Sequence, residues 1–508
     1  ELRPYQDAGV ARMRQHILDG TLRNLLVLPT GGGKTVVAAA IIHSARRNFD
    51  GRVLFVAHRI ELIDQAVKQL ARWGITEVGV IRADDPRRNE LMPVQVASIQ
   101  TLSRRDCSWF QPDIIFIDEA HRSCAESYRK LFALYPDAKI IGLTATPCRQ
   151  DGQALGEMYG SLEVCATYAE LITDGFIVEP LCIGAEKHPD LSNVHTIAGD
   201  YNLAELEAAM MQPVIISGAV DAWKKHRHLR TVVFASGVKH SQQLVAEFQA
   251  AGARAAHVDG DTPPEVRATV GEALRMGDLD VVSNFGVYTE GWDEPCVKCC
   301  ILLRPTKSLT LYRQMVGRIL RPWEKTQPVI LDHALSIDRH GMPTEDIEWS
   351  IDGKPKRHAD AAKFRMCPKC FAYQRAAPKC ELCGHVYEVK QRELPREVDA
   401  PLVVRTAGPD EKRRFYDEQV EIARRKGFKP GFPSFKVKEK YGDWPPWAWS
   451  QATKAAYAAD PIWQAGVAKQ TERREFWKAR QQMGAPVETE ANIERHVEES
   501  FGDWVRTS

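Results

Sequence analysis

The sequence lacks long apolar runs and has few cysteines for its length. No stretch approaches the ~18 consecutive apolar residues of a membrane-spanning helix, and the first residues contain no apolar signal-peptide core. Twelve cysteines in 508 residues are too few for a disulfide-stabilised scaffold. An excess of charge of one sign is also lacking, because the net charge is only +1. These absences predict a reduced, soluble, cytoplasmic protein that makes no contact with a membrane.

The near-neutral total hides an uneven distribution of charge. Residues 401–480 hold 17 Lys or Arg against 10 Asp or Glu, a local net charge of +7. Residues 481–508 hold 2 against 6, a local net charge of −4. The composition is otherwise ordinary, with 44% hydrophobic and 27% charged residues, and at this length it predicts three or four globular domains.

Short apolar runs alternate with amphipathic stretches in two series. The first series lies at residues 25–28, 53–57, 114–117 and 140–143. The second series lies at residues 231–235, 281–283, 301–303 and 329–331. Short continuous apolar runs are typical of parallel strands that are buried on both faces. We therefore predict an α/β protein with two tandem parallel-sheet domains, followed by a small cysteine module and a mainly helical C-terminal domain. The predicted boundaries are 1–180, 181–345, 360–390 and 400–508.

A glycine-rich segment follows the first apolar run. Residues 29–35 read PTGGGKT and precede a predicted helix over residues 36–45. Glycines let the backbone approach phosphate oxygens, and the helix N-terminus offers amide N–H groups to them. Lys34 would then reach the β and γ phosphates of a nucleotide, and the Thr35 hydroxyl would bind magnesium. The strict phosphate-loop pattern requires Gly where this chain has Leu28, so a simple glycine-rich turn is the alternative. The predicted nucleotide-binding residues of the segment are Thr30, Gly31, Gly32, Gly33, Lys34 and Thr35.

Two carboxylates follow the apolar run at residues 114–117. Asp118 and Glu119 stand directly at its carboxyl end, and ligands bind at the carboxyl ends of parallel strands. We expect Asp118 to hold Mg²⁺, and Glu119 to orient and deprotonate an attacking water. A carboxylate pair at this place is also a common helix N-cap, which is the alternative.

Two arginines stand in the second α/β domain. Arg318 and Arg321 are three residues apart in a predicted helix over residues 311–320, which places them on one helix face. An exposed arginine pair is commonly a solvated surface. If the two domains close on one ATP, however, these guanidinium groups can stabilise charge on the γ-phosphate, an effect of about 10³ to 10⁵ in rate.

In this order, these segments resemble the superfamily-two DEAH-box helicases and translocases over roughly residues 1–335. The box itself is DEAH at residues 118–121, and residues 314–321 read QMVGRILR. The resemblance implies two RecA-like domains that hydrolyse ATP with Mg²⁺. The further nucleotide-site residues that it implies are Arg3, Gln6, Gly291, Asp293 and Gln314. The residues that it implies for coupling are Thr144 and Thr146. The nucleic-acid contacts that it implies are Arg59, Gln100, Thr101 and Thr289.

Within that superfamily, the chain is most similar to RadD-type DNA-repair ATPases and phage-encoded relatives. Residues 304–318 carry this likeness. Two features depart from it, since Ala120 stands where that group often has Cys, and the C-terminal third has no counterpart. The resemblance implies single-stranded or branched DNA as a partner, with single-strand-binding or replication and repair proteins as further partners.

Four cysteines form a spaced pair of turns. Cys367 and Cys370 are separated by nine residues from Cys380 and Cys383, and each pair has the CxxC spacing. Two such turns close a four-sulfur structural zinc site with no open catalytic position. The other eight cysteines read as reduced core thiols, including three at residues 296–300 that we expect to pack in a strand.

Residues 340–366 are polar and read as a linker, and residues 405–450 combine lysines and arginines with tryptophans. Cations neutralise phosphates and aromatic rings stack on bases, which is how single strands are bound without sequence preference. Tryptophans also fill the cores of small domains, so both interpretations stay open.

The sequence thus predicts a DNA helicase or translocase that depends on ATP and Mg²⁺, acting in DNA repair, recombination or replication. One alternative is a translocase or remodeller that moves on duplex DNA without separating strands. A second is an adaptor whose ATPase is a switch and whose zinc and C-terminal regions recruit partners. A restriction-type motor with its own nuclease is not favoured, because the chain has no convincing carboxylate–lysine cluster.

Overall fold

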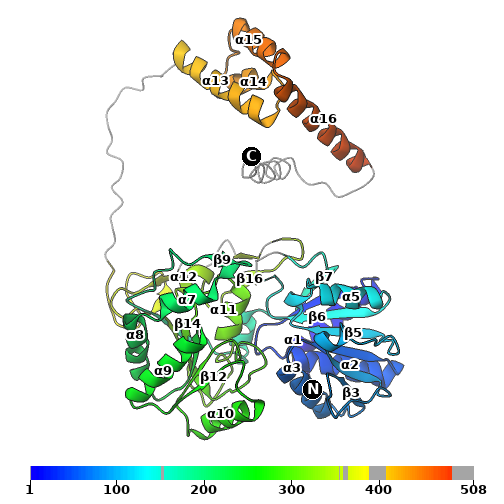
Figure 1. The fold of residues 1–508 in the computed structure, drawn as a ribbon, viewed down its shortest axis with the longest axis vertical. Coiled ribbons are helices and arrows are strands. Elements are labelled where there is room, and N and C mark those ends of the chain that lie inside the picture. The colour runs from blue at the N-terminus through cyan, green and yellow to red at the C-terminus, as the bar shows by residue number, and fades with distance from the viewer. Residues whose placement is uncertain (1, 150–153, 354, 358–363, 388–407, 483–508) are drawn as a thin grey trace. The chain divides into compact units, whose positions relative to one another are not determined.

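The computed structural model describes residues 2–149, 154–353, 355–357, 364–387 and 408–482. The chain divides into two compact units, Glu1–Lys390 and Gln391–Ser508, and each is described by itself. The first unit contains two parallel sheets with helices on their faces (Figure 1). The second unit is helical.

The first domain is built on a seven-stranded parallel sheet. Its strands are β1 (Arg23–Val27), β2 (Val53–Ala57), β3 (Val78–Ile81), β4 (Val94–Ser98), β5 (Ile114–Asp118), β6 (Lys139–Thr144) and β7 (Ser161–Val164). Their order is β3-β4-β2-β5-β6-β1-β7, and all pairs are parallel. The apolar runs predicted as strands form β1, β2, β5 and β6. Since β1 and β5 end at the same edge of the sheet, the phosphate loop and the acidic pair open on the same side.

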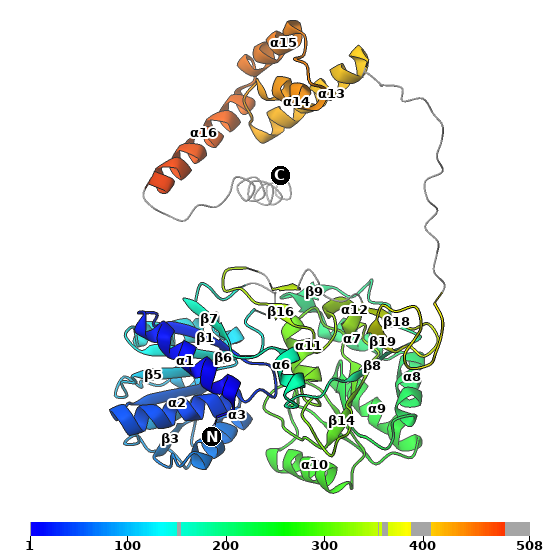
Figure 2. The same ribbon diagram turned by 180° about the vertical axis from the view of Figure 1, so that it is seen from behind.

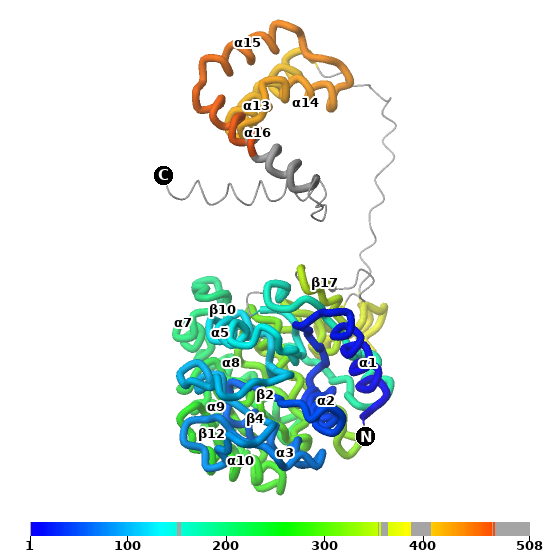
Figure 3. Tube along the Cα trace, turned by 90° about the vertical axis from the view of Figure 1, so that its right-hand side faces the viewer, coloured from blue at the N-terminus to red at the C-terminus, as the bar shows by residue number. Residues whose placement is uncertain are grey.

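Helices cover both faces of this first sheet. They are α1 (Pro4–Leu18), α2 (Lys34–Phe49), α3 (Ile60–Arg72), α4 (Ile99–Leu102), the 3₁₀ turn η1 (Ala120–Arg122), α5 (Glu126–Leu134) and α6 (Tyr168–Thr173). Buried residues of α1, α2 and α3 join one core cluster, and those of α5 join another on the opposite face. α1 and α2 lie side by side (Figure 3). The spacing of Leu62, Ile63, Ala66 and Leu70 gives α3 its buried face.

The second domain repeats this design with six parallel strands. They are β8 (Leu181–Gly184), β11 (Arg230–Ala235), β12 (Ala255–Val258), β13 (Val281–Asn284), β14 (Val297–Leu303) and β15 (Val329–Asp332), in the order β12-β13-β11-β14-β15-β8. The helices are α7 (Leu203–Met210), α8 (Pro213–Lys224), α9 (Val238–Ala250), α10 (Pro264–Met276), α11 (Leu309–Val316) and α12 (Ser336–His340). A short hairpin, β9 (Thr196–Ile197) and β10 (Asp200–Tyr201), precedes α7. The predicted fold class, two tandem RecA-like domains, is confirmed.

The predicted helix over residues 311–320 is too long. α11 ends at Val316 and is followed by Gly317, so Arg318 and Arg321 do not share a helix face. The side chain of Arg318 instead donates to the backbone carbonyls of Gln314, Thr289 and Trp292, at 3.2, 2.6 and 2.8 Å. These tertiary hydrogen bonds take the place of another helical turn. Of the three cysteines expected to pack in a strand, Cys299 and Cys300 are buried in β14, whereas Cys296 is buried just before the strand begins.

The segment predicted as a linker does more than connect. It contains β16 (Ile347–Glu348) and β17 (Lys356–Arg357), which pair with each other. The Asp346 carboxylate accepts N–H groups at the start of α6, at 2.7 and 3.3 Å. Trp349 and Ile351 pack against the core cluster beneath α5. The chain therefore returns from the second domain to the first before it reaches the cysteines, which a spacing argument could not reveal.

The cysteine module covers the edge of the second sheet. Its hairpin, β18 (Phe364–Met366) and β19 (Tyr373–Arg375), lies beside the edge strand β8 (Figure 2). The Gly184 N–H donates to the Phe371 carbonyl at 2.8 Å, and Ile183 bridges to Ala372. The hairpin therefore protects backbone groups of an edge strand that would otherwise be exposed.

The second unit is helical, as predicted. It contains α13 (Pro409–Lys426), α14 (Phe432–Tyr441), α15 (Trp447–Ala458) and α16 (Pro461–Gln482). Tyr416, Val437 and Trp463 are buried in its small core. The Tyr416 hydroxyl lies 2.8 Å from that of Thr453, and the Trp463 indole N–H donates to the Phe428 carbonyl at 2.8 Å. The acidic tail lies almost wholly outside the described residues.

No single helix in the described part of the chain is both long and apolar enough to cross a membrane. Within the same described residues, α7 and α8 reach that length and hydropathy only as a pair, which is bent by 69°. Their buried residues, among them Met210 and Trp223, belong to a core cluster of the second domain.

Candidate functional site

The glycine-rich loop between β1 and α2 is shaped by its backbone. Gly31 and Gly33 have φ of 93° and 87°, in the left-handed region that favours glycine. A Cβ on Gly33 would lie 2.5 Å from Nε2 of Gln6, so a larger residue would displace its neighbour. α2 begins at Lys34, with Gly33 as its N-cap and no side-chain cap. The first amide groups of α2 therefore stay available for an anion.

The start of α1 supports this loop from the outside. Gln6 is 2% exposed, and its Nε2 donates to the Gly32 carbonyl at 2.9 Å. The Tyr5 hydroxyl donates to the same carbonyl at 2.8 Å. The guanidinium of Arg3 lies 3.8 Å from the centre of the Phe176 ring. The structure thus places Gln6 against the phosphate loop, with Arg3 beside it.

The acidic pair lies at the end of β5 and is buried. Burial and the charge of Glu119 raise the pKa of Asp118 to about 7. Burial alone would raise the pKa of Glu119 too, but the charge of Lys34 and a hydrogen bond with His121 hold it at about 2. The charge of Lys34 therefore lowers the pKa of both carboxylates, against the effect of burial. Thr35 and Asp118 offer oxygen ligands, the class that Mg²⁺ prefers.

Residues of the second domain lie directly over the phosphate loop. A Cβ on Gly317 would lie 2.6 Å from Cβ of Thr30, and one on Gly31 would lie 3.6 Å from Cγ of Arg321. Arg321 forms an ion pair with Asp293. Arg318 is held by backbone carbonyls, and the charge of Glu119 acts on it across the domain boundary. Arg321 therefore lies beside the glycine-rich loop, and Arg318 lies within the electrostatic influence of Glu119; both stand in the turn after α11 and not on a helix face.

A buried carboxylate that sequence reasoning missed joins the two domains. Glu290, whose side chain is 1% exposed, follows β13 in the second domain. Its carboxylate lies 2.6 Å from Nε2 of His58, 3.1 Å from Nε of Arg59 and 3.0 Å from Nη2 of Arg122, all in the first domain. It also accepts from Nε2 of Gln314 at 3.1 Å. We call these five residues the Glu290 cluster.

The charge of Glu290 is well compensated. Burial would raise its pKa, but the hydrogen bond from His58 and the charges of Arg122 and Arg59 hold the pKa well below its usual range. Glu290 is therefore ionised at neutral pH. His58 and Arg59 follow β2, Arg122 follows the DEAH box, and Gln314 lies in α11. One carboxylate therefore contacts side chains up to 232 residues away in the sequence.

Of the two threonines predicted for coupling, Thr144 is the last residue of β6 and Thr146 lies in the turn that follows. Thr144 and Thr146 are both buried, and the Thr144 hydroxyl accepts the Thr146 N–H at 3.1 Å while donating to its carbonyl at 3.0 Å. β6 pairs with β5, and Leu143 lies opposite Asp118. The turn after β6 is therefore held rigidly beside the acidic pair.

Three of the four predicted nucleic-acid contacts line one basic pocket of about 500 Å³ on the first domain. They are Arg59, Gln100 and Thr101. The pocket is also lined by basic residues that were not predicted, namely His58, Arg82, Arg104 and Arg105. Thr289 is 4% exposed and does not line the pocket, and its carbonyl accepts from Arg318. Gly291, which was predicted to contact the nucleotide, lies against α3, and the Gln65 side chain donates a hydrogen bond to its carbonyl.

Two family profiles match this region. The profile described as "Type III restriction enzyme, res subunit" matches residues 1–149, and the profile "Helicase conserved C-terminal domain" matches residues 212–322. The first range includes the phosphate loop and the acidic pair. The second includes Glu290 and Arg318.

Curated relatives extend the match. The chain is 30% identical over 380 residues to a 51.5 kDa protein of Lactococcus phage (isolate 7-9), covering 74% of this chain and 80% of that protein. It is 31% identical over 365 residues to the DNA 3'-5' translocase XPB2 of Sulfurisphaera tokodaii, covering 64% and 80%. The chain belongs to the superfamily-two helicases. It is therefore an ATP-hydrolysing enzyme.

This helicase is also 32% identical over 339 residues to the Saccharomyces cerevisiae protein IRC3, assigned as an ATP-dependent helicase, covering 63% of this chain. That match spans about half of the yeast protein, at 49% of its length. Among solved structures, a fragment assigned as the HsdR subunit of a type I restriction enzyme from Vibrio vulnificus YJ016 has a TM-score of 0.53 at 22% identity, covering 70% of each chain. That likeness concerns the fold alone.

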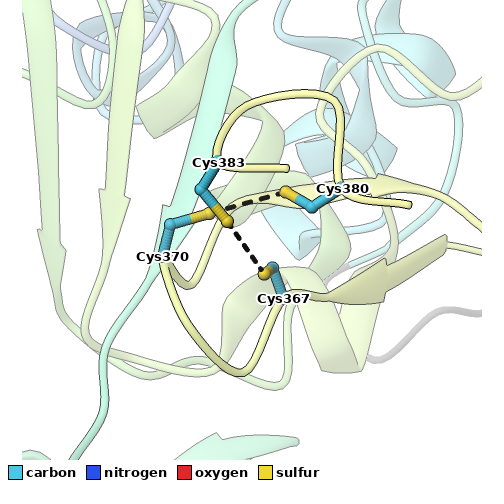
Figure 4. Close-up of side chains that lie close together, drawn as sticks. All are labelled: Cys367, Cys370, Cys380 and Cys383. Atoms are coloured by element: carbon cyan, nitrogen blue, oxygen red, sulfur yellow. Dashed lines mark hydrogen bonds between the residues drawn. The ribbon is translucent and has the colours of Figure 1, made fainter. Parts of the chain in front are cut away.

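The four predicted cysteines of the helicase lie together (Figure 4). Their Sγ atoms all lie within 4.8 Å of one another, and Cys367–Cys383 and Cys370–Cys380 are each 3.7 Å apart. In a tetrahedral zinc site, Zn–S bonds of about 2.3 Å place the sulfurs about 3.8 Å apart. The donor set and its spacing therefore fit a closed four-sulfur site. Among the described residues, no other group of three or more ligating side chains is arranged for a metal.

Sequence reasoning missed the Glu290 cluster and the extra arginines of the pocket for the same reason. Glu290 stands between the predicted residues Thr289 and Gly291, but nothing in these neighbours shows that three side chains of another domain converge on it. Arg104 and Arg105 were visible as a basic pair, yet such pairs are common on solvated surfaces. Only the tertiary contacts distinguish these residues from ordinary charged residues on the protein surface.

Proposed function

We propose that this helicase couples ATP hydrolysis between its two RecA-like domains to movement on DNA. The observation that carries the proposal is that Gly317 and Arg321 of the second domain lie against the phosphate loop, where the charge of Glu119 also acts on Arg318. In this arrangement the second domain contributes positive charge to the γ-phosphate, so hydrolysis depends on domain closure. XPB2, named a DNA translocase, supports DNA as the track.

The roles of the site residues follow from this geometry. Lys34 and the N-terminus of α2 hold phosphate oxygens, and Thr35 with Asp118 would hold Mg²⁺, which neutralises charge on the phosphates when bound. Glu119, ionised and buried beside Lys34, accepts the proton of the attacking water. Because Thr144 and Thr146 are held beside the acidic pair, a change at the acidic pair on ATP hydrolysis would move this turn, and through it the rest of the first domain.

The basic pocket is the proposed place for the DNA backbone. His58 and Arg59 belong both to the pocket and to the Glu290 cluster, so the pocket shares two residues with the contact that joins the two domains. Contacts of this kind read phosphates and carry no base information, so we expect no sequence specificity. RadD-like work in DNA repair, with single-strand-binding proteins as partners, is the biological setting that the sequence resemblance favours.

The cysteine cluster is proposed to hold one structural zinc ion. Backbone N–H groups outweigh burial and lower the pKa of Cys367 to about 6, so thiolate is available at neutral pH. With zinc bound, the hairpin of β18 and β19 would be held against β8, and the metal would supply folding energy to a segment too small for its own core.

The test is the steady-state ATPase rate without nucleic acid and with single-stranded DNA, duplex DNA, a fork and RNA. Stimulation by one DNA form, abolished in Glu119→Gln, is expected, and the form that stimulates names the track. Stimulation by duplex DNA alone, without strand separation, would select the duplex translocase. A flat rate in every arm would refute a DNA motor and leave the ATP-switched adaptor.

A further inference from the structure

The turn between α14 and α15 exposes large aromatic side chains. Trp444 is 59% exposed, Trp447 is 71% exposed, and Phe435 on α14 is 59% exposed. The two tryptophans are three residues apart, so their Cα atoms lie within about 11 Å of each other. A small helical unit thus places two indole rings in water at one corner.

Trp444 and Trp447 are not needed to fill the core of the unit. That core already contains Trp463, which is buried, and Trp449, whose ring lies 5.4 Å from that of Tyr416. The expectation that tryptophans fill a small core therefore holds for Trp449 and Trp463. It does not hold for Trp444 and Trp447. Leaving their large apolar surfaces in water is unfavourable for stability, so their exposure needs another explanation.

Lysines accompany the exposed rings. Lys438 Nζ lies 4.5 Å from the centre of the Trp444 ring, and Lys454 Nζ lies 5.4 Å from that of Trp447. Phe435 and Lys438 are three residues apart on α14 and share one helix face. We call these five residues the Trp platform.

The charge of the platform is not neutralised locally. Residues 432–454 contain two acidic residues, Glu439 and Asp443. Glu439 pairs with Lys436 at 2.6 Å, and Asp443 pairs with Lys412 at 3.6 Å. Within residues 408–472, neither lysine of the platform has a carboxylate partner. The platform therefore presents aromatic faces with unneutralised positive charge.

We propose that the Trp platform is a second nucleic-acid site, which binds a single strand by stacking bases on Trp444 and Trp447 and placing phosphates on Lys438 and Lys454. Stacking on aromatic rings tolerates any base, and cations beside the rings neutralise the backbone. A duplex keeps its bases stacked on each other and cannot use the rings. A protein partner fits less well, because lysine is depleted at protein–protein interfaces.

This site goes beyond the proposed motor, since it lies in the other unit and uses no ATP. The full-length protein is tested with a single strand that carries 5-iodouracil, which crosslinks to aromatic side chains on irradiation, followed by peptide mapping. We expect crosslinks within residues 441–454, in the wild type and equally in Glu119→Gln. Crosslinks confined to residues 1–390 would overturn the proposal.

Fluorescence anisotropy gives the matching affinities. Trp444→Ala with Trp447→Ala is expected to weaken single-strand binding by roughly fivefold or more for each ring, with the basal ATPase rate unchanged. The Phe substitutions at both positions should restore much of the affinity. Trp109→Ala, which removes a 37% exposed tryptophan of the first unit, is the matched control and should change nothing.

The charge component has its own readout. Lys438→Ala with Lys454→Ala should reduce the slope of log affinity against log salt by about 1.4, since each single-strand phosphate contact contributes about 0.7. Binding within about twofold of wild type in both double variants, or equal crosslinking of a duplex, would refute single-strand stacking. A flat ATPase rate with the platform crosslinks intact would refute the motor alone, so the two proposals fail separately.

Discussion

Glu290→Gln is the most informative single substitution, because it removes one negative charge from between the two domains. Truncating one partner of a buried ion pair costs about 3–5 kcal/mol. Arg59 and Arg122 are 26% and 34% exposed, so water recovers part of this loss and about 1–3 kcal/mol of domain closure remains. That corresponds to a fall of about 5- to 150-fold in the ratio of closed to open enzyme.

The assay is kcat/KM for ATP, with thermal unfolding measured in parallel. Glu290→Gln should lower kcat/KM by that factor and change the melting temperature little, since each domain keeps its own core. The matched control is Glu294→Gln. Glu294 is also a buried carboxylate, but it pairs with Arg275 of the same domain, at 2.7 Å.

We expect Glu294→Gln to lower the melting temperature and to leave the ATPase rate of the folded enzyme close to wild type. A double-mutant cycle of Glu290→Gln with Arg122→Gln should also show coupling, because the two side chains are in contact. An unchanged kcat/KM in Glu290→Gln, or an equal loss in Glu294→Gln, would refute the reasoning that this cluster holds the domains closed.

Three further predictions concern other parts of the molecule. Gly317→Ala places a Cβ 2.6 Å from Cβ of Thr30, so it should destabilise the closed arrangement of the two domains by about 1–3 kcal/mol and slow ATP hydrolysis without unfolding the protein. The control is Gly218→Ala, whose added Cβ has nothing within 4 Å and which should leave the ATPase rate unchanged. Cys380→Ser or a strong chelator should release the zinc detected by a colorimetric dye and lower the melting temperature; a purified protein that holds no zinc and ignores the chelator would contradict this. Burial raises the pKa of Asp332 from 3.8 to about 6, so the folded state keeps this proton to higher pH than the unfolded state does. The free energy of unfolding should therefore fall as the pH rises between these two values. Urea unfolding at several pH values should show this fall in the wild type and a smaller one in Asp332→Asn.

Much of the fold could be predicted from local pattern. The apolar runs became strands because a strand buried on both faces must be apolar throughout, whatever surrounds it. The end of α11 could not be predicted, because the backbone carbonyls that hold Arg318 come partly from a turn 26 to 29 residues away. The same holds for residues 346–351, which lie inside the segment that we read as a linker but whose Trp349 is partly buried against the first domain.

The sequence by itself was enough to identify the chemical groups whose role depends on residues next to them in the chain. The glycines and Lys34 belong to one loop, the acidic pair ends one strand, and each CxxC turn offers two sulfurs at once. Only the tertiary structure decided which distant groups meet. Glu290 is important because His58 and two arginines of another domain contact it. Trp463 is buried whereas Trp444 is exposed, and nothing next to them in the sequence distinguishes the two. Contacts between segments that are distant in the sequence leave no periodic pattern, so only the folded structure shows them.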